Sequence, residues 1–298
     1  MTKILILILM LLLIFLLIRH RESISSVYKT SKARKGNTIV YSYKVENREA
    51  ITEPWYTQKI PFKIHQTSFS RNMDYRLSTS CIVNHNINPE YQYYFYDDAD
   101  VTAYIKENFP QYLAHYNSMK PGAYKADLFR LLVLYKEGGV YIDCKSSGVA
   151  ALREMLRSDD EIFMTKDLLK GCIYQGFICS VPGHELMKKF IDKFITNIEN
   201  KSYGINCFDI GGPQMIGRVL NAYTGKGELD PIEEVDVEGV RVGATIKLLE
   251  VGTDLITSMD SKKIYFERAN PDYYKKKVKS MLMGKEYGIA WVTGRVYE

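Results

Sequence analysis

Residues 121–145 read PGAYKADLFRLLVLYKEGGVYIDCK, a run that predicts one helix followed directly by one strand. Pro121 suits the first turn of a helix. Gly138 and Gly139 suit its end, where the backbone takes a left-handed conformation. The positions between them are mostly apolar, so we expect a helix that is buried on nearly all sides. The strand that follows ends at Asp143.

Two charged residues lie inside this predicted helix, Asp127 and Arg130, three positions apart and therefore on one face. They form an internal ion pair in one interpretation and line a polar pocket in the other. An apolar pair would stabilise a buried helix as well as an ion pair does, so we favour the pocket. In open α/β sheets ligands bind beyond the carboxyl ends of strands, and Asp143 stands at such an end. We therefore expect Asp127, Arg130 and Asp143 to converge on one cleft.

Lys145 follows Asp143 by two positions. Side chains alternate along an extended stretch, so both side chains are expected on the same face. The lysine either supplies a positive charge to a bound diphosphate or points to solvent beyond the strand, and the sequence leaves both interpretations open. A carboxylate at this place suits a diphosphate that is bound together with Mg²⁺ or Mn²⁺.

From Lys59 onward, short apolar runs alternate with helical patterns. An amphipathic helix is predicted over residues 184–200, because its apolar side chains recur with helical spacing. Strands are predicted at IPFKIHQ, YQYYFY, IFMT and CIYQGFICS, and Tyr174 and Gln175 in the last of these are expected to border the cleft. Strands interleaved with helices predict an α/β fold with a largely parallel sheet.

Three stretches together carry a family resemblance: PFKIHQTSF at residues 61–69, the central run quoted above, and GGP at residues 211–213. Over residues 59–215 the chain resembles the glycosyltransferases that contain the DXD sugar-binding region, a family with fungal initiating mannosyltransferases and related bacterial capsule and viral enzymes. The resemblance implies a GT-A-like, Rossmann-type fold with a mostly parallel central sheet. It also implies hexosyl transfer from a UDP- or GDP-sugar to a glycan or glycoprotein, with retention of the anomeric configuration.

The resemblance also implies roles for individual residues. Asp127 and Arg130 would hold hydroxyl groups of the donor sugar, and Asp143 would meet the sugar and a metal ion. The nucleotide and the rest of the donor would be contacted by His65, Gln66, Tyr124, Lys145 and Gly212. Without the resemblance, two of these residues have simpler explanations. His65 would be a core histidine whose ring nitrogens are hydrogen-bonded, and Gly212 would be part of a plain turn before a helix.

Two positions depart from the family pattern. The second acid of the DXD motif is replaced by Lys145, and Ala290 stands near the place where the family has a metal-side histidine. A divalent cation, Mn²⁺ or Mg²⁺, remains the cofactor that the resemblance implies, with Asp143 as its ligand. The departures also favour an alternative function, a non-catalytic protein that binds nucleotide sugars or glycans through a degenerate DXD site.

The amino terminus contains fifteen unbroken apolar residues, Ile4–Ile18. We interpret residues 1–18 as a membrane anchor, in preference to a cleaved signal peptide or a core helix, because no small-residue cleavage site follows and no face is polar. Residues 19–55 are then a basic stem or linker and residues 56–298 the catalytic domain. The basic flank after the apolar run favours a single-pass protein with its body in the cytosol.

The formal net charge of +5 is unevenly spread along the 298 residues. Residues 1–63 hold 11 Lys and Arg against 4 Glu, whereas the remainder holds 29 Lys and Arg against 31 Asp and Glu. The main body therefore lacks the basic excess of a nucleic-acid-binding protein, and we expect no nucleic-acid partner. The five cysteines form no C-x-x-C pair and lie mostly in apolar runs, so we interpret them as small buried hydrophobes.

Overall fold

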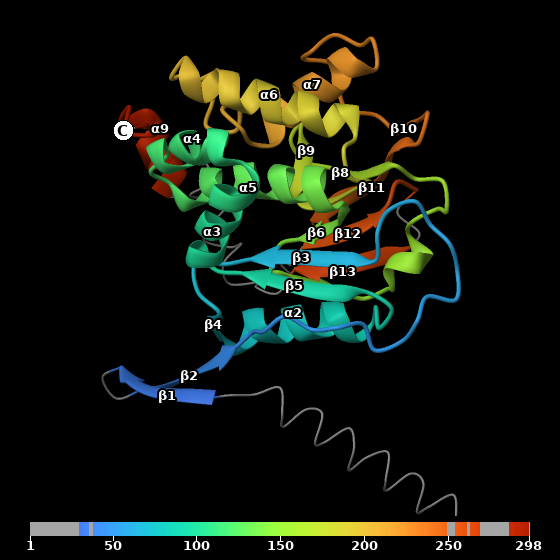
Figure 1. Cartoon of the computed structure of the whole chain (residues 1–298). Helices are drawn as coiled ribbons and strands as arrows, with labels where there is room; N and C mark the ends of the chain where they lie inside the picture. Colours follow the sequence, from blue (N-terminus) through green and yellow to red (C-terminus); the bar gives the residue numbers. More distant parts are fainter. Residues whose placement is uncertain (1–29, 36–37, 249–253, 261–262, 269–285, 298) are drawn as a thin grey trace, which may run out of the picture.

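A mixed α/β architecture is seen in the computed structural model, which describes residues 30–35, 38–248, 254–260, 263–268 and 286–297 (Figure 1). Within these residues the central sheet has ten strands. Their order is β5 (Gln92–Tyr96), β3 (Lys63–Thr67), β6 (Gly139–Ile142), β9 (Ile173–Ser180), β8 (Ile162–Lys166), β11 (Val240–Leu248), β12 (Asp254–Ser258), β13 (Ile264–Arg268) and β7 (Ser146–Gly148), with β10 (Val235–Val237) paired to β11.

The strand directions in this sheet are mixed. β3 runs parallel to both β5 and β6, and β8 runs parallel to β11. The other pairs are antiparallel, among them both pairs made by β9. The α/β class is thus confirmed, but parallel pairing does not predominate as expected. Residues 167–172 return the chain from β8 to β9, and this connection is too short for the crossover that parallel neighbours need.

Helices cover both faces of the sheet (Figure 1). One face is covered by α3 (Asp98–Asn108), α4 (Leu113–Ser118), α5 (Gly122–Glu137), α6 (Glu185–Glu199), α7 (Pro213–Tyr223) and α9 (Glu286–Val292), with a 3-10 turn at Pro110–Tyr112. The opposite face carries α2 (Tyr75–Asn86) and a 3-10 turn at Leu152–Glu154. β6 is buried between the two layers. Tyr141 packs into the core on the α5 side of the sheet, while Val140 and Ile142 pack into the core on the α2 side. A strand that is buried on both sides accounts for the continuous apolar run before Asp143.

The corner between α5 and β6 depends on two glycines, as the sequence predicts. Gly138 and Gly139 take φ values of +62° and +99°, which side chains other than glycine rarely adopt. A Cβ on Gly139 would also lie 2.5 Å from the carbonyl oxygen of Lys63 on β3. The corner therefore leads the chain from the end of α5 directly into β6, the strand that lies between β3 and β9 in the sheet.

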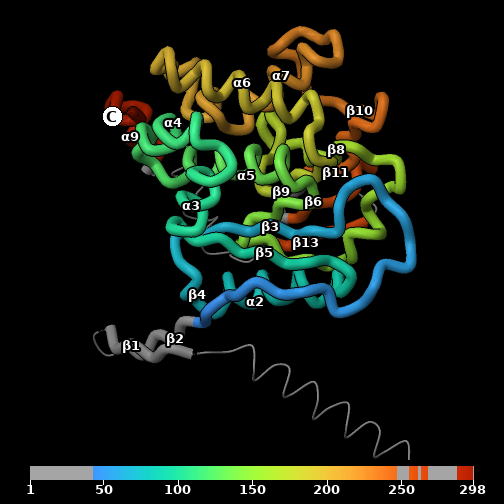
Figure 2. The backbone as a smooth tube through the Cα atoms, viewed as in Figure 1, coloured from blue at the N-terminus to red at the C-terminus, as the bar shows by residue number. Residues whose placement is uncertain are grey.

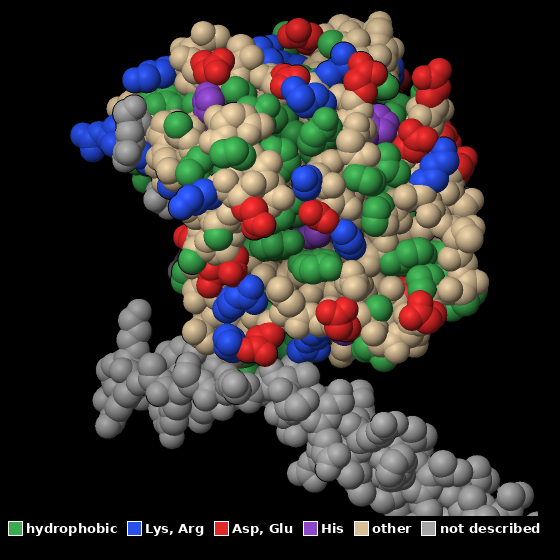
Figure 3. All heavy atoms as spheres, in the orientation of Figure 1, with side chains coloured by type: hydrophobic (Ala, Val, Ile, Leu, Met, Phe, Trp, Pro, Cys, Tyr) green, Lys and Arg blue, Asp and Glu red, His purple; other side chains and the backbone are tan. Residues whose placement is uncertain are grey.

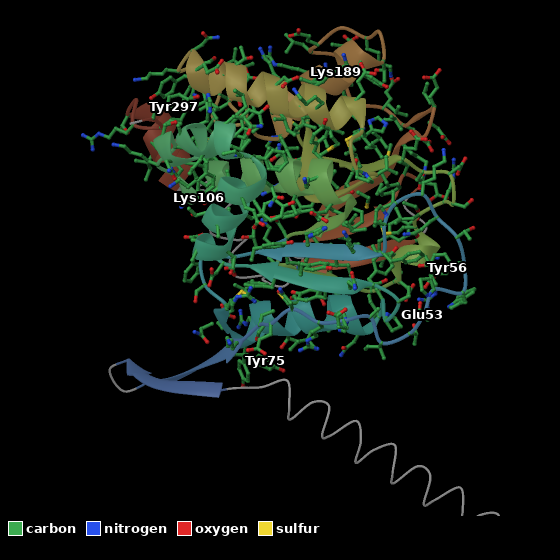
Figure 4. The ribbon with its side chains drawn as sticks, viewed as in Figure 1. Glu53, Tyr56, Tyr75, Lys106, Lys189 and Tyr297 are labelled. Carbon is green, nitrogen blue, oxygen red and sulfur yellow. The ribbon has the colours of Figure 1, made fainter. Side chains whose placement is uncertain are left out.

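The segment expected as a stem is partly packed on the body. β1 (Thr30–Lys35) and β2 (Thr38–Lys44) form a hairpin, and β2 pairs with β4 (Asn72–Asp74). The chain then loops around the end of the sheet before it returns as β3 (Figure 2). Val45 is buried, and the Tyr56 hydroxyl donates to Glu90 Oε1 at 2.7 Å (Figure 4). Residues on the amino-terminal side of the expected boundary at residue 56 thus contact the body.

The expectation of a membrane protein needs correction. No helix in the described part of the chain is long and apolar enough to cross a bilayer. Ile4–Ile18, on which the expectation rested, lies outside the described residues.

The cysteines and the charged surface agree with an ordinary globular body. Cys81, Cys144, Cys172 and Cys179 are buried free thiols, and Cys207 is half-buried, so their interpretation as small hydrophobes is confirmed for four of the five. Basic and acidic side chains are interspersed over the described face in Figure 3. That face presents no continuous basic surface of the kind that binds nucleic-acid backbones.

Candidate active site

A cavity of about 280 Å³ opens beside the carboxyl end of β6. Its wall combines charged side chains from α5 and the strand ends with apolar side chains from the surrounding loops. The charged members are Asp127, Arg130, Asp143, Lys145 and Asp167, and the apolar members include Tyr124, Leu168, Leu169, Phe208, Pro213, Ile246 and Tyr287. The structure thus brings Asp127, Arg130 and Asp143 to one cleft, at the strand end where the sequence predicts it.

Arg130 is the most constrained charged group of the cavity. Its Nη2 lies 3.0 Å from Asp127 Oδ1 and 3.8 Å from Asp143 Oδ1. Its Nη1 donates to the carbonyl oxygen of Gln175 at 2.6 Å, and its guanidinium stacks over the Tyr141 ring at 4.7 Å. The side chain is only 7% exposed. The planar guanidinium therefore holds both carboxylates in fixed positions at the cavity wall.

Asp143 and Lys145 line the same cavity, but a turn rather than an extended backbone places them there, because the Ser146 N–H donates to the Asp143 carbonyl at 2.8 Å. The Asp143 N–H donates to the Gly176 carbonyl on β9 at 2.8 Å, so the residue continues the ladder of β6. Lys145 Nζ lies 2.7 Å from Asp143 Oδ2. Cys144, between them, is buried and its thiol donates to the carbonyl of Thr67 at 3.2 Å. Cys144 is thus enclosed, while both of its charged neighbours line the cavity.

The cavity raises the cost of negative charge at Asp127. Burial raises the pKa of Asp127 to about 6; Arg130 lowers it in part, and Asp143 raises it further. Burial also lowers the pKa of Arg130, but its contacts with Tyr141, Asp127 and Asp143 outweigh burial and leave it above the ordinary value. Since Arg130 is charged at every accessible pH, the protonation of this pair changes only through Asp127. Asp127 with Arg130 and Asp143 with Lys145 thus form two pairs of opposite charge, and Asp167 adds a further carboxylate to the wall.

Tyr124 and Gly212, which the resemblance assigned to the donor, also line the cavity. The Tyr124 hydroxyl donates to the Cys207 carbonyl at 2.8 Å, which fixes the ring against the Tyr287 ring, 6.0 Å away. Gly212 caps the start of α7, and a Cβ there would lie 2.9 Å from the Phe208 carbonyl oxygen. The loop before α7 can therefore close over the cavity only with glycine at this position.

His65 and Gln66 lie away from the cavity wall, in the interior of the sheet. His65 is fully buried; its Nε2 lies 3.0 Å from the Gly138 carbonyl oxygen, and burial lowers its pKa to about 4. Gln66 donates to the Ile142 carbonyl at 3.0 Å and accepts from the Tyr93 hydroxyl at 2.8 Å. The two side chains hold the corner and the end of β6 in place, and neither of them lines the cavity.

Several lining residues escape sequence reasoning. Leu168, Leu169 and Tyr287 come from loops or from a distant helix, and no local pattern marks them. Gly176 carried a usable signal, because an isolated glycine within a strand often marks a close approach of other groups. A Cβ on Gly176 would lie 2.7 Å from Asp143 Oδ2 and 2.1 Å from the Tyr174 hydroxyl oxygen.

The donor set of the cavity does not fit a divalent cation. Mg²⁺ and Mn²⁺ prefer several oxygen ligands that are not already neutralised. Asp143 instead contacts the ammonium of Lys145 on one oxygen and faces Arg130 with the other. Among the described residues no group of three or more His, Cys, Asp or Glu side chains is placed to hold a metal ion. Ala290, near the position where the family resemblance places a metal-side histidine, packs against the core on the α5 side of the sheet.

Comparison with known proteins finds a family match for one part of the chain, which supplies some of the lining residues of the cavity. Residues 76–162 match the family model "Glycosyltransferase sugar-binding region containing DXD motif". The matched residues make up less than a third of the chain. This region runs from α2 through α5 and β6 to the start of β8, and it contains Asp127, Arg130, Asp143 and Lys145. Within the matched residues, Asp143-Cys144-Lys145 stands where the family resemblance places the DXD motif.

The chain is also similar to curated fungal proteins over part of its length. The chain is 28% identical over 119 residues to inositol phosphoceramide mannosyltransferase 3 of Schizosaccharomyces pombe, covering 39% of this chain and 30% of the relative. It is 27% identical over 138 residues to the mannosyl phosphorylinositol ceramide synthase SUR1 of Saccharomyces cerevisiae (44% and 34%). It is 30% identical over 89 residues to the initiation-specific alpha-1,6-mannosyltransferase of Candida albicans (29% and 23%). The matches span about a third or less of the length of these relatives.

A solved structure, the PaToxG glycosyltransferase, matches with a TM-score of 0.44 and 18% identity. The match covers 56% of this chain and 70% of that chain.

Proposed function

We propose that this protein is a glycosyltransferase with a GT-A-like fold that transfers a hexose from a UDP- or GDP-sugar to a glycan or glycoprotein acceptor. The observation that carries the proposal is the convergence of Asp127, Arg130, Asp143 and Lys145 on one cavity within the sugar-binding region. Fixed charges of both signs suit a donor that has neutral hydroxyl groups at one end and a diphosphate at the other.

Asp127 and Arg130 would bind the donor sugar. A carboxylate accepts hydrogen bonds from two sugar hydroxyls, and a guanidinium donates to hydroxyl oxygens. Arg130 is already held by the Gln175 carbonyl and the Tyr141 ring, so little conformational entropy is lost when a sugar binds. The apolar wall of Tyr124, Phe208 and Tyr287 would then pack against the sugar ring or the nucleotide base.

The reaction would break the bond between the anomeric carbon and the diphosphate oxygen and form a bond from that carbon to an acceptor hydroxyl oxygen. Negative charge develops on the departing diphosphate, so positive groups fixed near it lower the barrier. Arg130 and Lys145 are the cations that line the cavity within the described residues. The acceptor proton would pass to the leaving diphosphate on the same face of the sugar, which retains the anomeric configuration.

The family resemblance implies a divalent cation, Mn²⁺ or Mg²⁺, which would neutralise the diphosphate of the donor when bound. Asp143 would be its one ligand from the motif in this chain. Because Asp143 is already engaged by Lys145 at 2.7 Å, we assign no step to the ion.

The proposal is tested with a panel of UDP- and GDP-linked hexoses, GDP-mannose among them because the relatives are named mannosyltransferases. The readouts are the shift in melting temperature and the release of nucleoside diphosphate, with mannose-terminated glycans and inositol phosphoceramide as trial acceptors. We expect one donor to raise the melting temperature and to turn over. Arg130→Lys should cut turnover at least ~100-fold, because a lysine cannot hold two carboxylates and the Gln175 carbonyl together.

Arg157→Lys is the matched control, since Arg157 pairs with Asp236 in an exposed ion pair away from the cavity. If no donor shifts the melting temperature or turns over, the proposal fails. A melting shift without turnover on any acceptor would instead support the alternative, a protein that binds nucleotide sugars without catalysis; the replaced DXD acid favours that candidate.

A further inference from the structure

The DXD position of this chain carries an ammonium group in place of the second carboxylate. A turn closed by the Ser146 N–H, which donates to the Asp143 carbonyl at 2.8 Å, follows β6, and Asp143 and Lys145 both line the cavity. Lys145 Nζ lies 2.7 Å from Asp143 Oδ2. The lysine side chain is 37% exposed, whereas that of Asp143 is 17% exposed. The ammonium therefore stands at the open side of the pair, where an incoming ligand meets it first.

A divalent ion and this ammonium would compete for one place. An ion coordinated by Asp143 would lie within a few ångströms of Lys145 Nζ and would be repelled by it. Arg130 Nη2, 3.8 Å from the other oxygen of Asp143, adds a second repulsive charge. A DXD motif with two carboxylates gathers negative charge that recruits a cation, whereas here Lys145 and Arg130 lie against the one carboxylate that remains, Asp143; Asp127 is paired with Arg130, and Asp167 also lines the wall.

We propose that Lys145 is the built-in cation of this site, and that its ammonium binds the diphosphate of the nucleotide sugar in place of a divalent metal ion. The inference rests on the proposed function, because it assumes a nucleoside-diphosphate donor. On donor binding, Lys145 Nζ exchanges part of its contact with Asp143 for the phosphate oxygens. When the bond to the anomeric carbon breaks, the electron pair goes to the diphosphate oxygen, and the ammonium stabilises that charge.

Asp143 then acts as the positioning group for the lysine. Its own place is fixed by the N–H bond to the Gly176 carbonyl and by the Gln66 contact at the preceding Ile142. A flexible lysine would otherwise lose entropy on ordering at the phosphate. The ion pair confines the ammonium to the cavity mouth before the donor arrives, which reduces that cost.

The test measures binding of UDP and GDP by calorimetry, in EDTA and in Mn²⁺, for the wild type and for Lys145→Ala, Lys145→Arg and Lys145→Asp. The wild type should bind one nucleoside diphosphate equally well in EDTA and in Mn²⁺. Lys145→Ala should weaken that binding in EDTA roughly 10- to 100-fold, the worth of one charge-assisted hydrogen bond. Lys145→Arg should retain most of the affinity, because the positive charge stays.

Lys145→Asp restores the two-acid motif. This variant should bind nucleoside diphosphate only in the presence of Mn²⁺. In the absence of nucleotide, it should bind Mn²⁺ more tightly than the wild type does. Lys59→Ala is the matched control, since Lys59 forms an ion pair of the same 2.7 Å length with Glu161 and does not line the cavity. It should leave binding unchanged.

The two proposals fail in different ways. If the wild type binds nucleoside diphosphate only with Mn²⁺, or if Lys145→Ala binds as the wild type does in EDTA, the built-in cation is refuted and the proposed function stands. If the wild type binds neither UDP nor GDP under either condition, the proposed function fails and this inference fails with it.

Discussion

Asp127→Asn is expected to make the protein more stable and, at the same time, inactive. Burial raises the pKa of Asp127 from 3.8 to about 6, so its ionised form is less favourable in the folded state than in the unfolded chain. One pKa unit is worth ~1.4 kcal/mol, which gives a cost of roughly 3 kcal/mol at neutral pH. Asparagine removes this cost and keeps an oxygen that can accept from Arg130. A gain of about 1–3 kcal/mol is therefore expected at pH 7.5.

The sign of the pH dependence follows from the same shift. Between pH 3.8 and about 6 the folded protein binds a proton at Asp127 that the unfolded chain has released. The stability that neutral Asp127 contributes is therefore complete below pH 3.8 and is lost as the pH rises to about 6. The advantage of Asp127→Asn over the wild type should be small near pH 4 and level off above pH 6.

The assay is urea unfolding of both proteins at a series of pH values, with donor turnover measured in parallel. The difference between the two proteins isolates Asp127, because the titration of His65 is common to both. Asp192→Asn is the control, since Asp192 forms an exposed pair with Lys188 on α6 and should change stability by less than ~0.5 kcal/mol. If Asp127→Asn loses stability at pH 7.5 and keeps its turnover, Asp127 is a structural ion-pair partner and the pocket interpretation is refuted.

Three further substitutions separate the site from the scaffold. Gly176→Ala should impair donor turnover more than stability, because the added Cβ displaces the Asp143 carboxylate; unchanged kinetics would contradict this. Gly139→Ala should lower stability by about 1–3 kcal/mol in urea unfolding, since it strains a φ of +99°, and a smaller loss would show that the corner relaxes. His65→Gln should reduce the loss of stability on acidification, because buried His65 stays neutral to about pH 4 whereas His65 in the unfolded chain binds a proton below about pH 6.5. An unchanged dependence of stability on acid pH would refute the lowered pKa of His65.

The sequence predicted the helix, the corner and the charged cluster because each depends on local signals. Apolar spacing marked α5, paired glycines marked its end, and a charged pair within an apolar helix marked the face that meets the cavity. Asp143 followed from the rule that ligands bind at the carboxyl ends of strands. Tyr124 and Gly212 came from the family resemblance alone, and both line the cavity in the structure.

The sequence failed where long-range pairing decides the outcome. His65 and Gln66 fall in a matching motif, but β3 is flanked by β5 and β6 and both side chains are enclosed. β9 lies antiparallel between β6 and β8, and no local pattern specifies which strand a given strand will join. The apolar wall from Leu168 and Tyr287 is assembled from segments more than a hundred residues apart.

The most direct test of the central claim is a crystal structure of the protein soaked with its nucleoside-diphosphate hexose in the presence of EDTA. The account predicts the hexose within hydrogen-bond distance of the Asp127 carboxylate and the Arg130 guanidinium, with the diphosphate at Lys145 Nζ. Donor bound elsewhere, for example in the hollow beside α6 and α7 that is lined by Lys189 and Lys193, with the Asp127 cavity empty, would contradict it.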